Sequence, residues 1–320
     1  MGIGYAGAYS IPRVDLGEAF QEYMFSLEQF IGMRLFTTMD VNRKEAQFAK
    51  ITRENQLRNE NLRRSAGSAY SRGTFEGEDD NYRCEEYGFE SPLDDSERAL
   101  YANDFDAEDE ATKLAFWKLM IAYEIRVSTI MQGADFTVAN GRRTDVAIAW
   151  TAPQADIIQD VLGAVETVRA RVGMKPDTFW CASSSIRDLI VNQGIRDSIV
   201  HTQRPTVAEV LGALASLFDV RQIVIGGQVQ NTALEGQAAV IADVWGARLW
   251  AGVCITAPAG SGLRSPCVGR TIYWRDDSPS DVTVEEYREE QVRSTIYRAR
   301  HNVDEKLMDT SYAQLLDIAG

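Results

Sequence analysis

The stretch ATKLAFWKLMIAYEIRVSTIM, residues 111–131, decides the fold of this 320-residue chain. It follows DAEDE at 106–110, and negative charge is favourable at the start of a helix. The apolar residues fall in two helical stripes, Leu114, Trp117, Ile121 and Ile125 in one and Phe116, Met120, Tyr123, Val127 and Met131 in the other. Two stripes leave little polar face, so the pattern predicts a long helix buried on several sides. A cofactor could bind such aromatic side chains, but core packing explains them more simply.

Two stretches of opposite charge precede this helix. Residues 41–73 contain eight basic and three acidic residues and few large apolar side chains. A segment of this composition cannot bury itself, so it is either disordered or a protrusion that another molecule supports. Residues 76–110 contain fifteen acidic residues and two arginines. Solvated faces are the usual explanation of such runs. Contact between a basic protrusion and an acidic surface on another copy is the alternative, and both stay open.

The N-terminal region is expected to be a flexible arm over residues 1–14, followed by a helix. Asp15 and Glu18 have the spacing of a capping box. Apolar residues then recur at helical spacing at Phe20, Met24, Leu27 and Ile31. This stripe could face the core or dock on a neighbouring subunit. The run Gly2–Gly7 matches a dinucleotide-binding glycine pattern, but no strand precedes it, so we treat the match as chance.

The second half of the chain alternates helices and strands and then becomes rich in strands. The spacing predicts helices at 154–171, 185–191 (capped by Ser183) and 206–218, strands at 177–182, 221–225, 238–242 and 247–254, and a loop at 226–236. Further strands are predicted at 268–275, 282–289, 294–300 and 302–308. The first group forms a compact α/β unit of domain size.

Composition excludes several classes of protein. The net charge of −14 argues against direct binding of nucleic acid, which requires a basic face. No apolar run is long enough to span a membrane, and no secretory signal is recognisable at the start. The cysteines Cys84, Cys181, Cys254 and Cys267 are far apart and form no CxxC pair, which favours reduced thiols over a metal site or disulfides.

Catalytic motifs are absent from the sequence. It contains no Walker A motif, GxSxG elbow, HExxH motif or EF-hand loop. Cys181 with His201 could form a thiol–imidazole pair, although a buried structural cysteine is the commoner case. The acidic cluster Asp104, Asp106, Glu108, Asp109 and Glu110 could hold a divalent cation, but helix-terminus charge explains it more simply. We therefore predict no catalytic, cofactor-binding or metal-binding residues and no enzyme activity.

Four segments, in this order, resemble the major capsid proteins of tailed phages. They are Tyr87–Asp95 leading into the long helix, Lys175–Ala182, Asn231–Gln237 before Ala242–Gly246, and Val284–Glu290 before Tyr297–Asn302. The resemblance covers roughly residues 85–310. Residues 1–84 match in layout. This family has no catalytic motif, so the order of the segments carries the resemblance.

The resemblance implies an α+β chain with the Hong Kong 97-type capsid fold. The N-terminal arm would be residues 1–40 and the extended loop 41–86. The peripheral domain would be 87–150 and 256–320, with a spine helix at 107–132 and long β-strands. The α/β axial domain would be 151–255. Gly226, Gly227 and Asn231 are candidates for its axial loop.

The resemblance also implies self-assembly into hexamers and pentamers of an icosahedral shell that encloses double-stranded DNA without sequence-specific binding. The chain would belong to the virion, would be assembled in the host cytoplasm, and would use no cofactor. Separate scaffolding, portal and decoration proteins are candidate partners, and Lys44 and Lys50 lie where some members crosslink, although we predict no crosslink. We hypothesise contacts from four arginines of the extended loop to four carboxylates of an adjacent copy: Arg53, Arg58, Arg63 and Arg64 with Asp94, Asp95, Asp104 and Asp106.

Two alternatives remain from the sequence. An encapsulin-type nanocompartment shell shares the fold and would enclose cargo enzymes; the neighbouring genes would distinguish it from a phage capsid. An α/β enzyme built on residues 150–255, with Cys181 and His201, is the other. It leaves the long helix and the basic segment unexplained.

Overall fold

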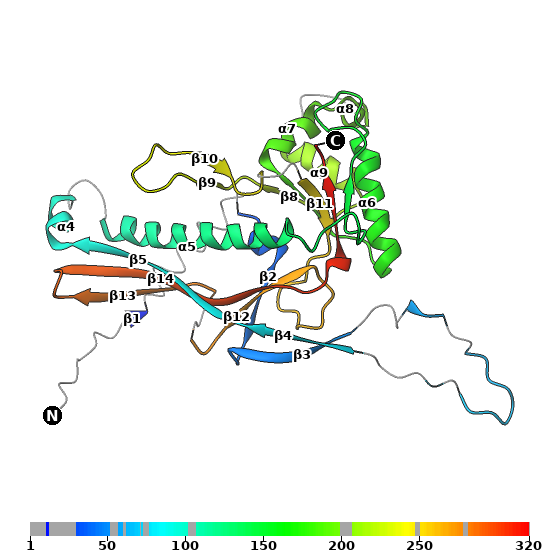
Figure 1. The fold of residues 1–320 in the computed structure, drawn as a ribbon, viewed down its shortest axis with the longest axis horizontal. Coiled ribbons are helices and arrows are strands. Elements are labelled where there is room, and N and C mark those ends of the chain that lie inside the picture. Colours follow the sequence, from blue (N-terminus) through cyan, green and yellow to red (C-terminus); the bar gives the residue numbers. More distant parts are fainter. Residues whose placement is uncertain are drawn as a thin grey trace.

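A helix of 25 residues, α5 (Ala107–Met131), runs along the molecule beside a long sheet (Figure 1). The computed structural model describes residues 11–12, 30–51, 57–59, 62–70, 72, 77–101, 107–198, 207–246, 250–277 and 281–319. No helix in these ranges is long and apolar enough to cross a membrane. The helix expected at 107–132 ends one residue earlier than predicted. The helix expected after Asp15 lies mostly outside the described residues.

One face of α5 is buried and the other is not. Phe116, Met120 and Val127 of the second apolar stripe lie in the core. The first stripe is only partly covered, and Leu114 keeps 48% of its surface exposed. Trp117, Ile121 and Ile125 of that stripe still pack against the core, so the expectation that this helix is buried on several sides holds in part.

The long sheet lies against α5. Its strands are β1 (Ile11–Pro12), β13 (Thr283–Glu289), β14 (Ser294–Leu307), β12 (Gly269–Trp274) and β2 (Thr37–Val41), in this order, with β5 (Glu85–Asp94) on the other edge of β14. The short helix α4 (Asp95–Tyr101) follows β5 at one end of the sheet. β12 and β2 are parallel, and the other pairs in this sheet are antiparallel.

The two strands predicted at 294–300 and 302–308 are a single strand. His301, between them, pairs with Tyr87 of β5, and Asn302 continues the register with Glu86. The His301 ring is buried beneath the edges of Tyr87 and Tyr123. Burial and the nearby Arg126 lower its pKa to about 3, so the ring stays neutral. A neutral imidazole can be buried without a charged partner, so His301 does not interrupt β14.

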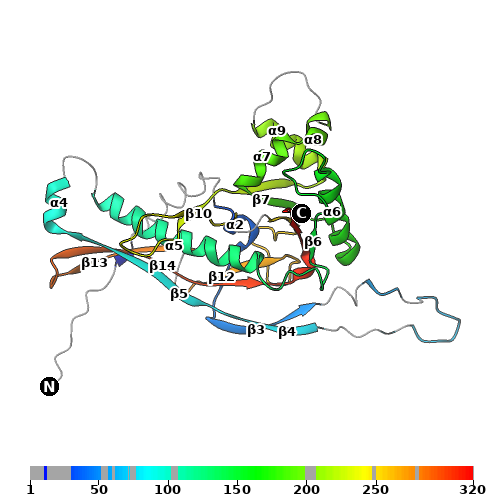
Figure 2. The same cartoon turned by 45° about the horizontal axis from the view of Figure 1, so that its top comes forward.

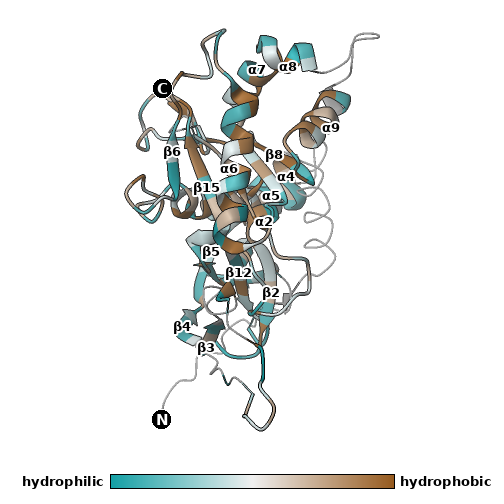
Figure 3. Cartoon of the chain, turned by 90° about the vertical axis from the view of Figure 1, so that its right-hand side faces the viewer, coloured by the Kyte–Doolittle hydropathy of each residue, from teal (hydrophilic) through white to brown (hydrophobic). Residues whose placement is uncertain are grey.

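A second sheet forms the core of a compact unit at one end of α5 (Figures 1 and 2). Its order is β6 (Arg143–Asp145), β15 (Ala313–Asp317), β11 (Trp250–Cys254), β7 (Thr178–Ala182) and β8 (Gln222–Gly226). Around it lie α6 (Ile157–Val172), α7 (Ser183–Val191), α8 (Gln193–Ser198) and α9 (Val207–Leu217). A 3₁₀ turn, η1 (Thr310–Tyr312), leads into β15. Every residue of β7 and β11 is buried. Figure 3 shows hydrophobic colour on several strands and helices of this unit.

The strand pairing joins segments that the domain division proposed from the sequence keeps apart. β6 and β15 lie within the segments 87–150 and 256–320, which were assigned wholly to the peripheral domain. Both strands belong to the second sheet, where β15 pairs with β11 and β6. The chain thus returns to the α/β unit at its C-terminal end. Sequence periodicity could not show this, because it identifies strands and not their partners.

Local signals explain the helix boundaries in this unit. The helix predicted from residue 154 begins at Ile157, because the Asp156 carboxylate accepts a hydrogen bond from the Gln159 N–H and caps it. It ends at Gly173, which has a positive φ of 72° that glycine adopts without strain. The predicted cap at Ser183 is wrong. Ser183 is the first residue of α7, and Ala182 precedes it without a side-chain cap.

Candidate assembly surfaces

A β-hairpin carries the basic segment away from the sheets. β3 (Glu45–Ile51) pairs antiparallel with β4 (Gly77–Arg83), and residues 52–76 connect the two strands. We call β3, β4 and the described residues between them (57–59, 62–70 and 72) the protrusion. It extends beyond the rest of the molecule in Figures 1 and 2. The segment predicted to be unable to bury itself is thus an outward extension of the subunit.

The base of the protrusion is anchored to the long sheet. Tyr82 and Cys84 form a small buried cluster with Val41 and Ile272. Lys306 of β14 pairs with Asp80 of β4 at 2.7 Å, and this bond contributes to the lowered pKa of Asp80. Burial raises the Asp80 pKa and is the largest single influence, but the contacts to Lys306 and to the Asn81 N–H outweigh it. The hairpin therefore leaves the sheet from a fixed base.

The outer part of the protrusion is exposed, including its apolar side chains. Leu62 and Tyr70 are 78% and 70% exposed. The Arg64 guanidinium lies 4.8 Å from the centre of the Tyr70 ring and donates a 2.6 Å hydrogen bond to the Ser68 carbonyl. Of the other proposed contact residues, Arg58 and Arg63 are exposed, and Arg53 lies outside the described residues. An exposed mixture of arginine and large apolar side chains is characteristic of protein interfaces.

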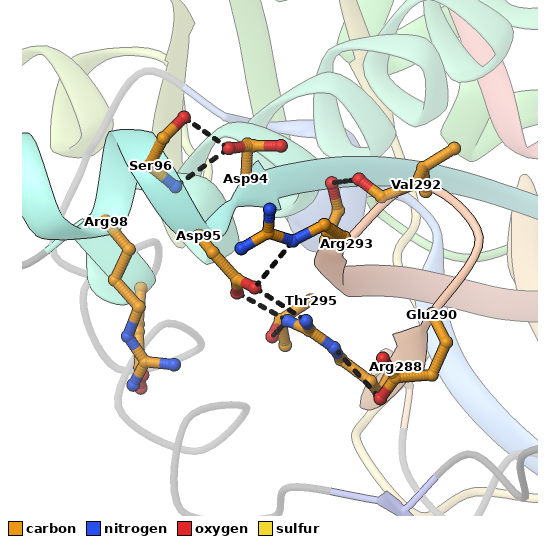
Figure 4. A network of polar contacts seen from close by, with 11 residues as sticks. Asp94, Asp95, Ser96, Arg98, Arg288, Glu290, Val292, Arg293 and Thr295 are labelled. Atoms are coloured by element: carbon orange, nitrogen blue, oxygen red, sulfur yellow. Dashed lines mark hydrogen bonds and ion pairs between the residues drawn. The ribbon is translucent and has the colours of Figure 1, made fainter.

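Asp94 and Asp95, two of the proposed acidic partners, are engaged within their own chain (Figure 4). Asp94 accepts hydrogen bonds from the Ser96 N–H at 2.8 Å and from the Ser96 hydroxyl, and these bonds lower its pKa. Asp95 accepts two bonds from Arg288, at 2.6 and 2.7 Å, and this contact is the main reason for its lowered pKa. Asp95 thus ties the start of α4 to β13, whereas Asp94 is bonded within its own turn, so both carboxylates already have partners in their own chain.

Other carboxylates are better placed for such contacts. Asp104 and Asp106, the remaining proposed partners, lie outside the described residues. Exposed acidic side chains do occur along β4, β5 and α4, at Glu78, Asp79, Glu86 and Glu97. The run of acidic residues at 76–110 is visible in the sequence. The sequence alone does not show which of these carboxylates pair within the subunit and which face solvent.

The axial-loop candidates have local structural roles. Gly226 is buried at the end of β8, where a Cβ would lie 2.5 Å from the Trp245 ring. Asn231 closes a second hairpin, because its Oδ1 accepts bonds from the Ala233 and Val240 N–H groups. This hairpin, β9 (Val229–Asn231) with β10 (Ile241–Asp243), occupies part of the predicted loop. Gly227 lies between β8 and β9.

The same hairpin exposes apolar residues that sequence reasoning missed. Leu234, Val240 and Ile241 are 74%, 56% and 63% exposed. An isolated two-stranded hairpin is marginally stable in water. Part of the signal was available in the apolar run Ala238–Ala242, which we predicted as a strand without asking whether it is exposed.

The structure offers no support for chemistry at the thiols. Cys181 is fully buried, and burial raises the pKa of its thiol to about 12. Its hypothetical partner His201 lies outside the described residues. Among the residues that the structure places, no group of three or more His, Cys, Asp or Glu side chains could hold a metal ion.

Known proteins with related sequences or folds include phage proteins and a virus-like particle from Pyrococcus furiosus, which has a TM-score of 0.57 at 12% identity over 95% of this chain and 98% of the other. No family model matches the chain. It is 22% identical over 277 residues to a protein named major capsid protein from the Burkholderia phage BcepMu, a match that covers 83% of this chain and 85% of the relative. A phage-related protein from Bordetella bronchiseptica has a similar structure, with a TM-score of 0.72 at 18% identity, over 97% of this chain and 98% of the other.

A phage capsid also shares the fold. The capsid protein of the cyanophage P-SCSP1u has a TM-score of 0.56 at 13% identity, over 99% of this chain and 92% of the other. The resemblance to tailed-phage major capsid proteins and the α+β Hong Kong 97-type fold expected from the sequence are confirmed. At these identities the structural matches establish the fold, and they leave the role of individual residues to the geometry described above.

Proposed function

We propose that this chain, which has the Hong Kong 97-type capsid fold, is a major capsid protein whose copies form the hexamers and pentamers of an icosahedral phage head. The whole-length similarity to phage capsid proteins carries the proposal. It is supported by a subunit that exposes a charged protrusion and the apolar residues of a second hairpin. In such an assembly the chain belongs to the virion and acts as a structural protein, without a catalytic group.

In this proposal the protrusion is the main inter-subunit element. Its exposed arginines, Arg58, Arg63 and Arg64, together with Arg53, meet carboxylates of an adjacent copy. Exposed partners such as Glu78, Asp79 and Glu97 fit this role better than Asp94 and Asp95, which the subunit already pairs. One exposed ion pair contributes at most about 1 kcal/mol. Repetition over many copies makes the sum large enough to set register and to make assembly sensitive to salt.

The net negative charge of the chain suits a shell that encloses double-stranded DNA without binding it tightly. A net charge of −14 keeps a shell wall from trapping the genome that it encloses. Purified protein is therefore expected to show no tight, salt-sensitive binding of duplex DNA. Such binding in an electrophoretic mobility assay at about 50 mM salt would contradict this part of the proposal.

The decisive experiment is negative-stain electron microscopy of the recombinant chain, with size-exclusion chromatography alongside. Hollow shells, or rings of five and six subunits, are expected. A small species from the chain alone calls for co-expression with the neighbouring genes, because a scaffolding protein can be required. If no particles form under either condition, the proposal is wrong.

The identity of the enclosed material separates a phage head from an encapsulin-type shell. Shells purified from the native source and treated externally with nuclease should retain DNA if the chain forms a phage head. Copurifying cargo enzyme, with no protected DNA, would favour the encapsulin alternative. Terminase and portal genes beside the coding sequence would agree with the first outcome.

A further inference from the structure

An arginine at the end of α6 is bonded to the segment that leads into β15. Arg171 donates from Nη1 to the carbonyl oxygens of Ser311 and Ala313, at 3.3 and 3.2 Å. From Nη2 it donates to the Gly141 carbonyl at 2.6 Å and to Gln314 Oε1 at 2.8 Å. All four acceptors are neutral oxygens. These bonds therefore fix the guanidinium in place without neutralising its charge.

A second arginine meets the same turn. Arg142, just before β6, donates from Nε to the Thr310 hydroxyl at 3.2 Å and from Nη2 to the Ser311 hydroxyl at 2.8 Å. This edge of a guanidinium has the geometry that carboxylate and phosphate groups match. Here it holds two neutral hydroxyls of η1. Both guanidiniums thus contact Ser311, and we call Arg142, Arg171, Thr310 and Ser311 the arginine site.

Other arginines beside the site have carboxylate partners. Arg143, the next residue after Arg142, pairs with Asp145 at 2.9 Å. Arg169, in the same last turn of α6 as Arg171, pairs with Glu166. Within the described ranges, the hydrogen bonds of the arginine site itself reach no carboxylate. The contrast shows two cations held together by neutral groups in a unit that otherwise pairs its charges.

The positive charge of the site is only partly compensated. Burial and the charge of Arg142 lower the pKa of Arg171 to about 10, and Asp309 opposes this shift with a smaller effect. The Asp309 carboxylate is already engaged, because its Oδ1 accepts a 2.8 Å bond from the Ser311 N–H. Both arginines are half-buried, so their charges are screened less than those of exposed side chains. An anion that reaches the site is therefore attracted to it.

The site also has donors that the subunit does not use. The hydroxyl oxygens of Thr310 and Ser311 accept bonds from Arg142, and neither hydroxyl donates to a residue that the structure describes. A hydroxyl that accepts a bond still has its O–H to donate. Arg142 Nη1 likewise donates to none of the described residues. These side chains are half-buried and not sealed from solvent. Guanidinium and hydroxyl donors together suit an oxyanion with several acceptor oxygens.

We propose that the arginine site binds a phosphate group, which accepts bonds from Arg142, Thr310 and Ser311, while Arg171 supplies the second positive charge. The bound group joins the segment before β6 to η1 and the end of α6, and so stabilises the return of the chain to the second sheet. Free phosphate and the phosphates of nucleic acid share this chemistry. Free phosphate is favoured, because the net charge of −14 repels a polyanion. The inference goes beyond the proposed capsid function and does not depend on it.

Isothermal titration calorimetry of the full-length protein with inorganic phosphate tests the proposal. Sodium chloride holds the ionic strength constant, so that screening does not change during the titration. Saturable binding is expected in the wild type. Arg142→Gln should weaken it by at least about tenfold, because a charge-assisted donor is lost. Arg143→Gln is the matched control and should bind as the wild type does. Absence of saturable binding in the wild type, or equal affinity in Arg142→Gln, would overturn the proposal.

A second variant separates a built site from diffuse attraction. The double change Thr310→Val and Ser311→Ala removes both hydroxyl donors and keeps both guanidinium charges. Phosphate binding should weaken severalfold in this variant. Circular dichroism of each variant checks that the subunit is folded. Unchanged affinity in the folded double variant would mean that the charges alone attract the anion, and the assigned site would be wrong.

Competition distinguishes the sources of the phosphate group. A single-stranded oligonucleotide at the same phosphate concentration should leave the binding of inorganic phosphate unchanged. Displacement by the oligonucleotide, lost in Arg142→Gln, would support the site and identify nucleic acid as the source. A carboxylate from a second copy is the other possible occupant. Self-association that falls in Arg142→Gln by size-exclusion chromatography, with no phosphate binding by the wild type, would replace the proposal with that contact.

Discussion

The protrusion and a buried junction have opposite relations to their own subunit. In the junction, Glu124, Ser128 and Gln132 bond to distant parts of the chain, which are Ile31, Gly32, Val244 and Trp245. Trp245 is fully buried. The protrusion is attached at its base and exposes Leu62 and Tyr70 to solvent. The junction contributes to the folding free energy of a single subunit, because its hydrogen bonds form within one chain. The outer part of the protrusion exposes its side chains, and in the proposed assembly these side chains gain contacts from other copies.

The largest effect on folding is expected from Trp245→Ala. The change removes a fully buried indole from its contact with Trp180 and leaves Glu124 without one of its donors. Loss of a large buried aromatic costs about 3–5 kcal/mol of unfolding free energy. Urea denaturation followed by circular dichroism measures it.

Trp245→Phe is the matched control for that change. It keeps an aromatic ring but removes the N–H donor and part of the indole volume, so a smaller loss of about 1–3 kcal/mol is expected. If Trp245→Ala is as stable as the wild type, the junction does not contribute to folding and the contrast with the protrusion disappears.

A pH dependence of stability should follow from Glu124. Burial raises the pKa of its carboxyl from 4.5 to about 7, so the folded state binds a proton more tightly than the unfolded state. The unfolding free energy should therefore fall as pH rises from about 4.5 to 7, by about 3 kcal/mol in all, and then stay constant. Chemical denaturation at a series of pH values, for the wild type and for Glu124→Gln, isolates this contribution as the difference between the two curves. Parallel curves would show that another group is responsible.

A pair of glycine substitutions compares tight packing with open space. In Gly226→Ala the new Cβ would meet the Trp245 ring at 2.5 Å, and overpacking of this kind costs about 1–3 kcal/mol. In Gly163→Ala, within α6, nothing lies within 4 Å of the new Cβ, and a helix gains about 0.5–1 kcal/mol from alanine. Thermal unfolding should lower the Tm of the first variant and raise that of the second. Equal shifts in the same direction would contradict the packing around Trp245.

The sequence predicted the protrusion better than the junction. The composition of residues 41–73 indicated a segment unable to bury itself, and the helix at 107–132 followed from periodicity. The junction was missed because its bonds join residues about 90 and 120 positions apart in the chain. The only local signal was Glu124 itself, a lone carboxylate among the apolar side chains of α5.

The candidate contacts were predicted only in part, for a similar reason. The charge run that contains Asp94 and Asp95 was visible, but Arg288, which binds Asp95, is 193 residues away. Likewise, no strand was predicted at Ala313–Asp317, and its pairing with β11, about 60 residues earlier in the chain, cannot be read from periodicity. Local patterns identify elements and exposed composition, whereas long-range pairing requires the three-dimensional structure.

The smallest effect on folding, with a large effect on assembly, is expected at the protrusion. Leu62 and Tyr70 are mostly exposed, so the double change Leu62→Ser and Tyr70→Ser should alter the unfolding free energy by no more than about 0.5 kcal/mol. Tyr82→Ser, at the buried base of the same hairpin, is the control and should destabilise the subunit clearly. Shell yield, measured by size-exclusion chromatography and microscopy, should fall severalfold in the double variant, because apolar contacts at an interface core carry much of its affinity. Normal yield would show that these side chains do not contact other copies. A large loss of stability would show that the protrusion packs on its own subunit, and the contrast between the two regions would then fail.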